Sequence, residues 1–142
     1  MHRRSLPDMT EVPVLYDPDC GFCRVSLALL LRWDTRGRLR PVALGSEEAD
    51  SLLDGMSEEE RMASWHLVEP GGVRSGGAAF APVFARLPGG RPFARATERF
   101  PHASDRLYRW VADHRSLLGR PLPASARRWA DRVISGSRPI GR

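Results

Sequence analysis

The stretch VPVLYDPDCGFCRVSLALLLRW, residues 12–33, decides the fold of this chain. It opens with an apolar run at residues 12–16, whose β-branched and aromatic residues are typical of a buried strand. An Asp-Pro-Asp turn ends that run, and a long apolar segment then predicts a helix from about Cys20 to Arg36. The only two cysteines, Cys20 and Cys23, are therefore predicted to lie where a strand gives way to a helix, about one helical turn apart.

The composition indicates one globular domain. The chain has 142 residues, of which 42% are hydrophobic and 27% charged, and its net charge is +5. The N-terminal ten residues are polar, and the densest apolar run, residues 25–33, is far shorter than the ~20 residues that cross a bilayer. We expect a cytoplasmic protein with no membrane insertion. In a reducing compartment, a lone Cys-x-x-Cys favours redox catalysis or metal binding over a structural disulfide.

The order of predicted elements is typical of a thioredoxin-like α/β fold. After the first strand and helix, the patterns predict strands at residues 38–44, 65–69 and 73–75, and helices at residues 46–53, from Ser57 onward, and at residues 78–87, 105–115 and 123–134. Pro41 indicates that the second strand lies at a sheet edge or strand end. The result is a βαβ unit, a ββα unit and additional C-terminal helices.

We expect three regions along the chain. Residues 1–11 are predicted to be a disordered tail, residues 12–118 the thioredoxin-like domain, and residues 119–142 an amphipathic helix followed by a tail that begins near Ser135.

The cysteine pair suggests thiol-disulfide exchange. A thiolate attacks a disulfide, and a helix N-terminus stabilises a thiolate. Cys20, at the predicted helix cap, is the expected nucleophile, and Cys23, one turn further on, is the expected, more buried resolving thiol. Phe22 would give the site an apolar lip for substrate. The cycle needs no bound cofactor.

Charged neighbours act on this pair in opposite directions. Asp19 disfavours a thiolate at Cys20, whereas Arg24 favours it. Asp17 is a candidate proton acceptor for the resolving thiol. The alternative is that Asp17 and Asp19 only form the turn and cap the helix, as aspartates before a helix often do.

The segment from Tyr16 to Cys23 resembles the signature of the DCC family of predicted thiol-disulfide oxidoreductases, in which Tyr-Asp-Gly-x-Cys-x-x-Cys follows a first strand. Residues 71–80 and 105–115 also resemble the family, so the likeness covers roughly residues 12–118. The resemblance implies a thioredoxin-like fold and a Cys20/Cys23 redox pair. Pro18 stands where the family usually has glycine, which stiffens the turn that a substrate backbone would approach. Thioredoxin also carries a cis-proline before its third strand. In this chain the residue before the predicted third-strand residue His66 is Trp65, not a proline.

Two other kinds of site are weaker alternatives. Zinc would need two of the distant histidines His2, His66, His102 and His114 to converge on the cysteines, and the sequence has no second closely spaced ligand pair. His66 is better explained as a hydrogen-bonded strand residue and His114 as a helix-end residue. Arginines next to Tyr108, Trp110 and Trp129 suggest nucleic-acid binding, but these aromatics fall on the apolar faces of predicted helices. We expect neither metal nor nucleic acid, and interpret Trp65 and Phe80 as core residues.

The sequence thus supports two functions. The first is a thiol-disulfide oxidoreductase that acts on a protein or small-molecule disulfide or thiol, with an electron donor that the sequence does not identify. The second is a thioredoxin-like redox sensor or binding module whose cysteines respond to oxidants without turnover.

Overall fold

The computed structural model describes residues 11–136. Its elements in chain order are β1 (Val12–Tyr16), α1 (Gly21–Trp33), β2 (Leu39–Ala43), α2 (Glu47–Leu52), α3 (Glu58–Ala63), β3 (His66–Glu69), β4 (Gly72–Ser75), the 3-10 helix η1 (Gly76–Ala79), α4 (Phe80–Ala85), α5 (Arg91–Arg99), α6 (Pro101–Asp113), α7 (Arg115–Gly119) and α8 (Ala124–Gly136).

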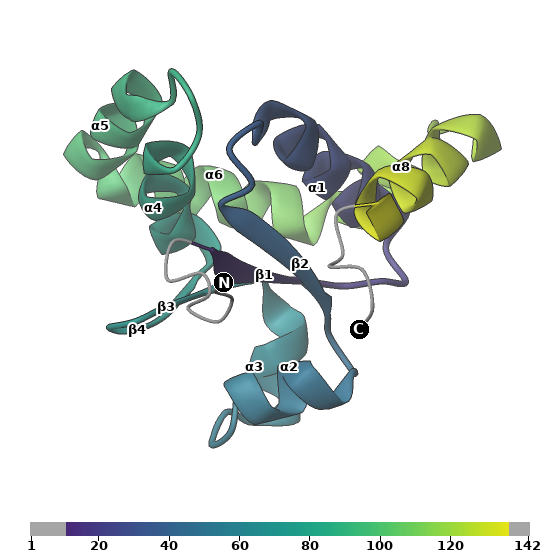
Figure 1. The fold of residues 1–142 in the computed structure, drawn as a ribbon, viewed down its shortest axis with the longest axis horizontal. Coiled ribbons are helices and arrows are strands. Elements are labelled where there is room, and N and C mark those ends of the chain that lie inside the picture. Colours follow the sequence, from purple (N-terminus) through teal and green to yellow (C-terminus); the bar gives the residue numbers. More distant parts are fainter. Residues whose placement is uncertain (1–10, 137–142) are drawn as a thin grey trace, which may run out of the picture.

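The four strands of the described residues form one mixed sheet in the order β2-β1-β3-β4. β1 runs parallel to β2 and antiparallel to β3, which forms an antiparallel hairpin with β4. Figure 1 shows α2 and α3 on one face of the sheet, and α1, α4, α5, α6 and α8 on the other. A βαβ unit followed by a ββα unit with further helices confirms the predicted thioredoxin-like α/β fold.

Strand periodicity in β1 divides the core between the two faces. Val12, Val14 and Tyr16 pack with residues of α1, α4 and α8, whereas Leu15 packs with α2 on the opposite face. All four side chains are buried, because successive residues of a strand point to opposite faces of a sheet that is covered on both sides. β1 is thereby fixed at the centre of the molecule, and the cysteine loop leaves from its end.

The predicted strands and the cap of α2 are confirmed, and β2, with Pro41, is an edge strand. The first helix ends at Trp33 rather than at Arg36. The reason is Asp34, whose buried carboxylate accepts hydrogen bonds from the N–H groups of Arg38 (3.0 Å) and Leu39 (2.8 Å). This contact turns the chain into β2, and Gly37 adopts a left-handed conformation (φ 66°) within that turn.

The C-terminal half contains more helix than the sequence predicted. α5 and α7 were not predicted, and α6 begins at Pro101, four residues before the expected start. Helical spacing groups Leu107 with Trp110 on one apolar face of α6, and the expectation that this face meets the core is wrong, because the two residues are 59% and 54% exposed. The inner face of α6 is instead formed by Tyr108, with Val111 and Ala112, which border a pocket.

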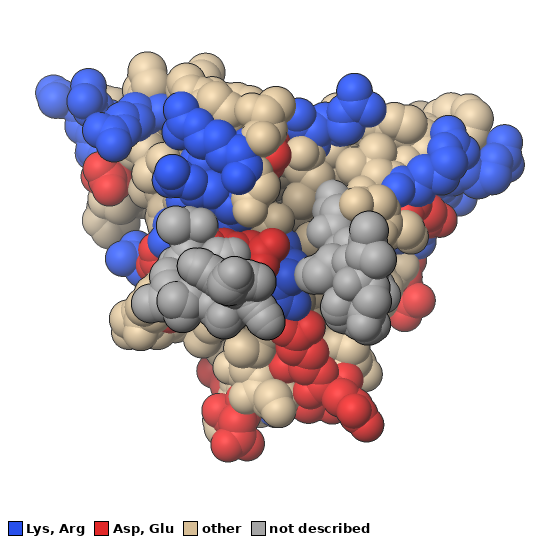
Figure 2. Space-filling model, in the orientation of Figure 1, with Lys and Arg blue, Asp and Glu red and all other residues tan. Residues whose placement is uncertain are grey.

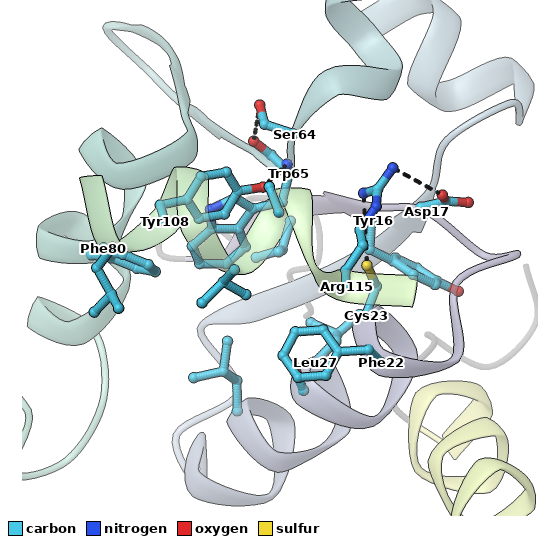
Figure 3. Close-up of a pocket in the computed structure, with 16 residues that line it drawn as sticks. Tyr16, Asp17, Phe22, Cys23, Leu27, Ser64, Trp65, Phe80, Tyr108 and Arg115 are labelled. Carbon is cyan, nitrogen blue, oxygen red and sulfur yellow. Dashed lines mark hydrogen bonds and ion pairs between the residues drawn. The ribbon is translucent and has the colours of Figure 1, made fainter. Parts of the chain in front are cut away.

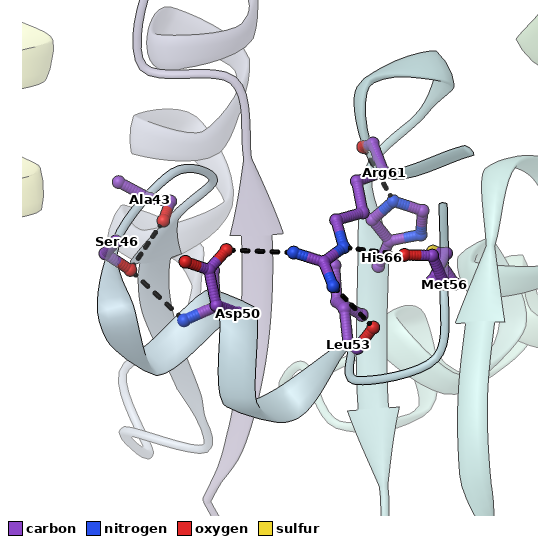
Figure 4. Close-up of polar contacts among 8 residues, drawn as sticks. Ala43, Ser46, Asp50, Leu53, Met56, Arg61 and His66 are labelled. Carbon is purple, nitrogen blue, oxygen red and sulfur yellow. Dashed lines mark hydrogen bonds and ion pairs between the residues drawn. The ribbon is translucent and has the colours of Figure 1, made fainter. Parts of the chain in front are cut away.

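A polar network joins α2 and α3 to the sheet (Figure 4). Arg61 pairs with Asp50 at 2.9 Å and donates to the carbonyl groups of Leu53 and Met56. The buried imidazole of His66 lies 2.9 Å from the Arg61 carbonyl and 2.6 Å from Ser75 Oγ. His66 is therefore a hydrogen-bonded strand residue, as predicted. A capping box of Ser57 and Glu60 opens α3, at the residue from which a helix was predicted.

Charge is unevenly distributed over the surface. Figure 2 shows acidic side chains over α2 and α3 and basic side chains over the ends formed by α5 and α8. The first turns of α2 and α3 carry six acidic residues, namely Glu47, Glu48, Asp50, Glu58, Glu59 and Glu60. Within the described residues, no helix combines the length and apolar character needed to span a membrane.

The predicted tails fall almost entirely outside the described residues. Of the C-terminal tail expected from Ser135 onward, Ser135 and Gly136 belong to α8, so that part of the expectation is wrong. Residues 1–10 and 137–142 lie outside the described part of the chain.

Candidate redox site

Cys20 is the N-cap of α1, as the sequence predicted. Its backbone is extended (φ −99°, ψ 113°), and its Sγ accepts a hydrogen bond of 3.3 Å from the backbone N–H of Cys23. A sulfur in this position receives an N–H that has no partner within the helix. Both cysteines are free thiols and both are half-buried. The pair is therefore within reach of solvent and close to the positive end of α1.

The two sulfur-bearing side chains open onto different pockets. Cys23 borders an apolar pocket of about 250 Å³, which Figure 3 shows between α1 and α6. Cys20 borders a polar pocket of about 360 Å³, formed by the loop before α1 together with α7 and α8. Asp17 and Arg115 border both pockets and so divide one from the other.

Arg115 contacts Cys23 across the boundary between these pockets. Its Nη1 donates to the Cys23 Sγ at 3.9 Å, and its Nη2 lies 3.7 Å from Asp17 Oδ2. Nη2 also donates to the Met62 carbonyl at 3.4 Å. No role for Arg115 was predicted from the sequence. Its only signal was that it ends the segment 105–115, which resembles the family.

Burial raises the pKa of the Cys23 thiol to about 12. Burial is the largest cause of this rise, the hydrogen bond to Cys20 and the charge on that residue contribute to it, as does Asp17 to a smaller degree, and Arg115 opposes it. Cys23 therefore keeps its proton at neutral pH. The two cysteines are chemically different, and the difference arises from their surroundings.

Arg24 contacts polar groups outside the cysteine pair. Its Nε pairs with Asp131 of α8 at 3.0 Å, and its Nη1 donates to the Pro18 carbonyl at 2.9 Å. The residue therefore ties the turn before the cysteines to α8. Pro18 accepts this hydrogen bond and borders neither pocket, whereas Phe22 borders the apolar one.

The two aspartates of the turn have different surroundings. Asp19 is exposed, and its backbone N–H donates to Asp17 Oδ1 at 2.9 Å. This contact matches the turn-forming alternative for Asp17. The other oxygen of Asp17 faces Arg115, so the carboxylate also lies in the group of charges around Cys23.

An aromatic wall closes the apolar pocket opposite Cys23. The Tyr108 hydroxyl accepts a hydrogen bond of 3.0 Å from the backbone N–H of Trp65. The centroids of the Trp65 and Tyr108 rings lie 5.7 and 5.9 Å from that of the Phe80 ring. Trp65 packs against the core as predicted, whereas Phe80 stacks on Phe84. Both residues are half-buried and line the pocket. The described residues contain no cis peptide bond, and Ser64 and Trp65 form the pocket wall just before β3.

The histidines of the described residues do not join the cysteines in a metal-binding group. His66 is held on β3 by Arg61 and Ser75, and His114, which ends α6 as predicted, stacks on Trp110 with ring centroids 4.4 Å apart. Within residues 11–136, no group of three His, Cys, Asp or Glu side chains could hold a metal ion.

A thioredoxin-like sheet with a Cys-x-x-Cys at the N-terminus of its first helix is an arrangement typical of thiol-disulfide oxidoreductases. A family model described as DCC1-like thiol-disulfide oxidoreductase matches residues 14–121. The chain belongs to this family, in agreement with the resemblance seen in its sequence. The same comparisons find no matching curated protein and no matching solved structure.

Proposed function

We propose that this chain catalyses dithiol-disulfide exchange, with Cys20 as the attacking thiolate and Cys23 as the resolving thiol. The observation that carries the proposal is the asymmetry of the pair. The Cys20 sulfur accepts an N–H from the first turn of α1, whereas the pKa of Cys23 is raised to about 12 by burial and by its neighbour. Cys20 is therefore the proposed attacking sulfur, and Cys23, which keeps its proton at neutral pH, is the proposed resolving thiol.

The first step is attack by the Cys20 thiolate on one sulfur of a substrate disulfide. A bond forms between Cys20 and that sulfur, and the second substrate sulfur leaves as a thiolate. Cys20 now carries no charge and is part of a mixed disulfide. Two of the influences that raised the pKa of Cys23, the hydrogen bond to Cys20 and its charge, are removed.

The second step is attack by Cys23 on the Cys20 sulfur. Arg115, 3.9 Å from the Cys23 Sγ, stabilises the negative charge that develops there. Asp17, on the other side of Arg115, is proposed to accept the Cys23 proton, directly or through water. The bond between Cys20 and the first substrate sulfur breaks, that sulfur leaves as the other thiolate, and the protein is left with a disulfide between Cys20 and Cys23. The protein dithiol loses two electrons, which the substrate disulfide gains.

Turnover distinguishes this function from a redox sensor. A catalytic amount of the reduced chain is mixed with an excess of disulfide substrate and of a dithiol reductant. Reduction of the substrate is then followed over many cycles. An enzyme sustains turnover well beyond one equivalent, and Cys20→Ser and Cys23→Ser each reduce it to background. A single equivalent of reaction followed by arrest would instead support the sensor, and equal activity of the Cys20→Ser variant would overturn the proposal.

A further inference from the structure

The polar pocket beside Cys20 has a lining suited to a charged thiol. Its walls come from the turn before α1 and from α7 and α8, and it contains three arginines, Arg115, Arg120 and Arg127. Asp17 pairs with Arg115. No carboxylate within residues 11–136 pairs with the guanidinium of Arg120 or of Arg127, so both cations are available to a ligand.

Close packing of α7 and α8 against the start of α1 forms this pocket. A Cβ atom at Gly21 would lie 3.0 Å from Arg127 Nε, and one at Gly119 would lie 3.3 Å from the backbone N of Phe22. The two glycines therefore let α7 and α8 approach the start of α1. Arg127 Nη2 donates to the Gly119 carbonyl at 3.1 Å, and its Nε is buried with no hydrogen-bond partner in the described part of the chain. The guanidinium is thus fixed at the pocket wall next to the Cys20 loop.

The geometry of exchange assigns this pocket to the substrate. When Cys23 attacks the Cys20 sulfur, the departing sulfur must leave from the side of Cys20 opposite Cys23, because displacement at sulfur is in line. Cys23 borders the apolar pocket and Cys20 borders the polar one. The group attached to the departing sulfur therefore lies in the polar pocket.

Resting on the exchange proposed above, we propose that this pocket binds a low-molecular-weight thiol that carries carboxylates. Arg120 and Arg127 bind the carboxylates, and the exposed carboxylate of Asp19, at the rim, accepts an amino group when the thiol carries one. In one direction, two electrons pass from the protein dithiol to the symmetric disulfide of this thiol, which is released as two thiols. In the other direction, two such thiols reduce the protein disulfide.

Three small disulfides test the charge preference. The reduced full-length chain is mixed with oxidised glutathione, which carries carboxylates, with uncharged 2-hydroxyethyl disulfide, or with cationic cystamine. The rate constant for each disulfide is divided by the rate constant with which dithiothreitol reduces the same disulfide. We expect oxidised glutathione to react about tenfold faster than cystamine, since each accessible charge pair contributes a factor of about five or less.

Reversing one charge sharpens the test. Arg120 is exposed, so Arg120→Glu leaves the fold intact, and the exposed Arg128 of α8 borders neither pocket and provides a matched control. We expect Arg120→Glu to slow oxidised glutathione about fivefold and to accelerate cystamine. Reaction with 2-hydroxyethyl disulfide should change less than about twofold, and Arg128→Glu should leave all three rates unchanged.

The other possible results separate failure of the binding proposal from failure of the exchange function. Equal normalised rates for the three disulfides, or equal effects of the two charge reversals, would overturn the binding proposal. Faster reaction with an apolar aromatic disulfide would also overturn it and would assign the substrate to the apolar pocket. In all these cases a Cys20-dependent reaction with 2-hydroxyethyl disulfide leaves the exchange function standing. If Cys20 reacts with no disulfide, the exchange function itself fails.

Discussion

Arg115 contacts Cys23 across 92 positions of sequence, with Nη1 lying 3.9 Å from Sγ. The contact joins the helical C-terminal region to the start of α1, and it brings a fixed positive charge to the cysteine whose pKa is otherwise raised by burial. Asp17 and the Met62 carbonyl hold the same guanidinium from other directions. Arg115 thus lowers the pKa of Cys23, the half-buried cysteine that we propose as the resolving thiol.

Arg115→Met should slow resolution of the mixed disulfide. Removing the charge leaves the developing Cys23 thiolate with less stabilisation, and we expect the second step to slow by at least about tenfold while the first changes little. Acid quenching followed by mass spectrometry measures both steps. Arg115→Lys should recover part of the rate, and Arg109→Gln, on the exposed face of α6, should behave like the unaltered protein. Equal slowing of both steps would contradict this role.

The pKa of Cys23 predicts how the stability of the reduced protein depends on pH. Its value is about 12 in the folded protein, against an ordinary value of 9.0. Between these values the unfolded chain has lost the proton that the folded chain retains. Stability of the reduced form should therefore fall as pH rises above about 9, by up to about 1.4 kcal/mol per pH unit.

Urea unfolding of the reduced protein from pH 8 to 10.5 measures this fall. The Cys23→Ser variant has no such thiol and should show a smaller slope over the same range. A slope that is the same in both proteins would contradict the raised pKa.

His66 predicts a loss of stability at acidic pH. Burial lowers the pKa of His66 from the ordinary 6.5. As the pH falls, the imidazole therefore binds a proton more readily in the unfolded chain than in the folded one. Stability should be complete above about pH 6.5 and should decline as pH falls below that value. Thermal unfolding from pH 7.5 to 5 measures the decline, which should be weaker in His66→Gln. A decline of equal size in that variant would assign it to other groups.

Gly77 should be intolerant of a side chain. A Cβ atom there would lie 2.7 Å from the Cα of Asp105, so α6 would have to move away from η1. We expect Gly77→Ala to lower the free energy of unfolding by about 1–3 kcal/mol and to disturb Tyr108, which α6 carries to the pocket wall. Denaturant unfolding measures the loss. Gly71→Ala is the control, because a Cβ atom at Gly71 meets nothing within 4 Å, and an equal effect of both changes would contradict the packing argument.

Local signals made the core of the fold predictable. The β1 run, the Cys20 cap, the Ser57 capping box and the edge position of Pro41 each depend on residues that are close in sequence. The start of α1 and the cysteine pair were therefore predicted from residues 12–33 alone.

Tertiary contacts explain what the sequence did not reveal. α5 has one buried residue, Ala94, and its Phe93 ring contacts Trp33 and Phe84 from distant elements. α7 spans five residues with no side-chain cap. Helical spacing in α6 grouped Leu107 with Trp110, but spacing does not say which face meets the core. The Arg115 contact with Cys23 depends on where α6 ends, which local patterns do not fix.

The most direct test of the account is which cysteine holds the mixed disulfide. Reduced Cys20→Ser and Cys23→Ser variants are incubated with a disulfide substrate, quenched in acid and analysed by peptide mass spectrometry. The account predicts that Cys23→Ser accumulates a stable adduct on Cys20, because no resolving thiol remains, and that Cys20→Ser forms little adduct at neutral pH. A stable adduct on Cys23 in the Cys20→Ser variant, with none on Cys20 in the other, would contradict it.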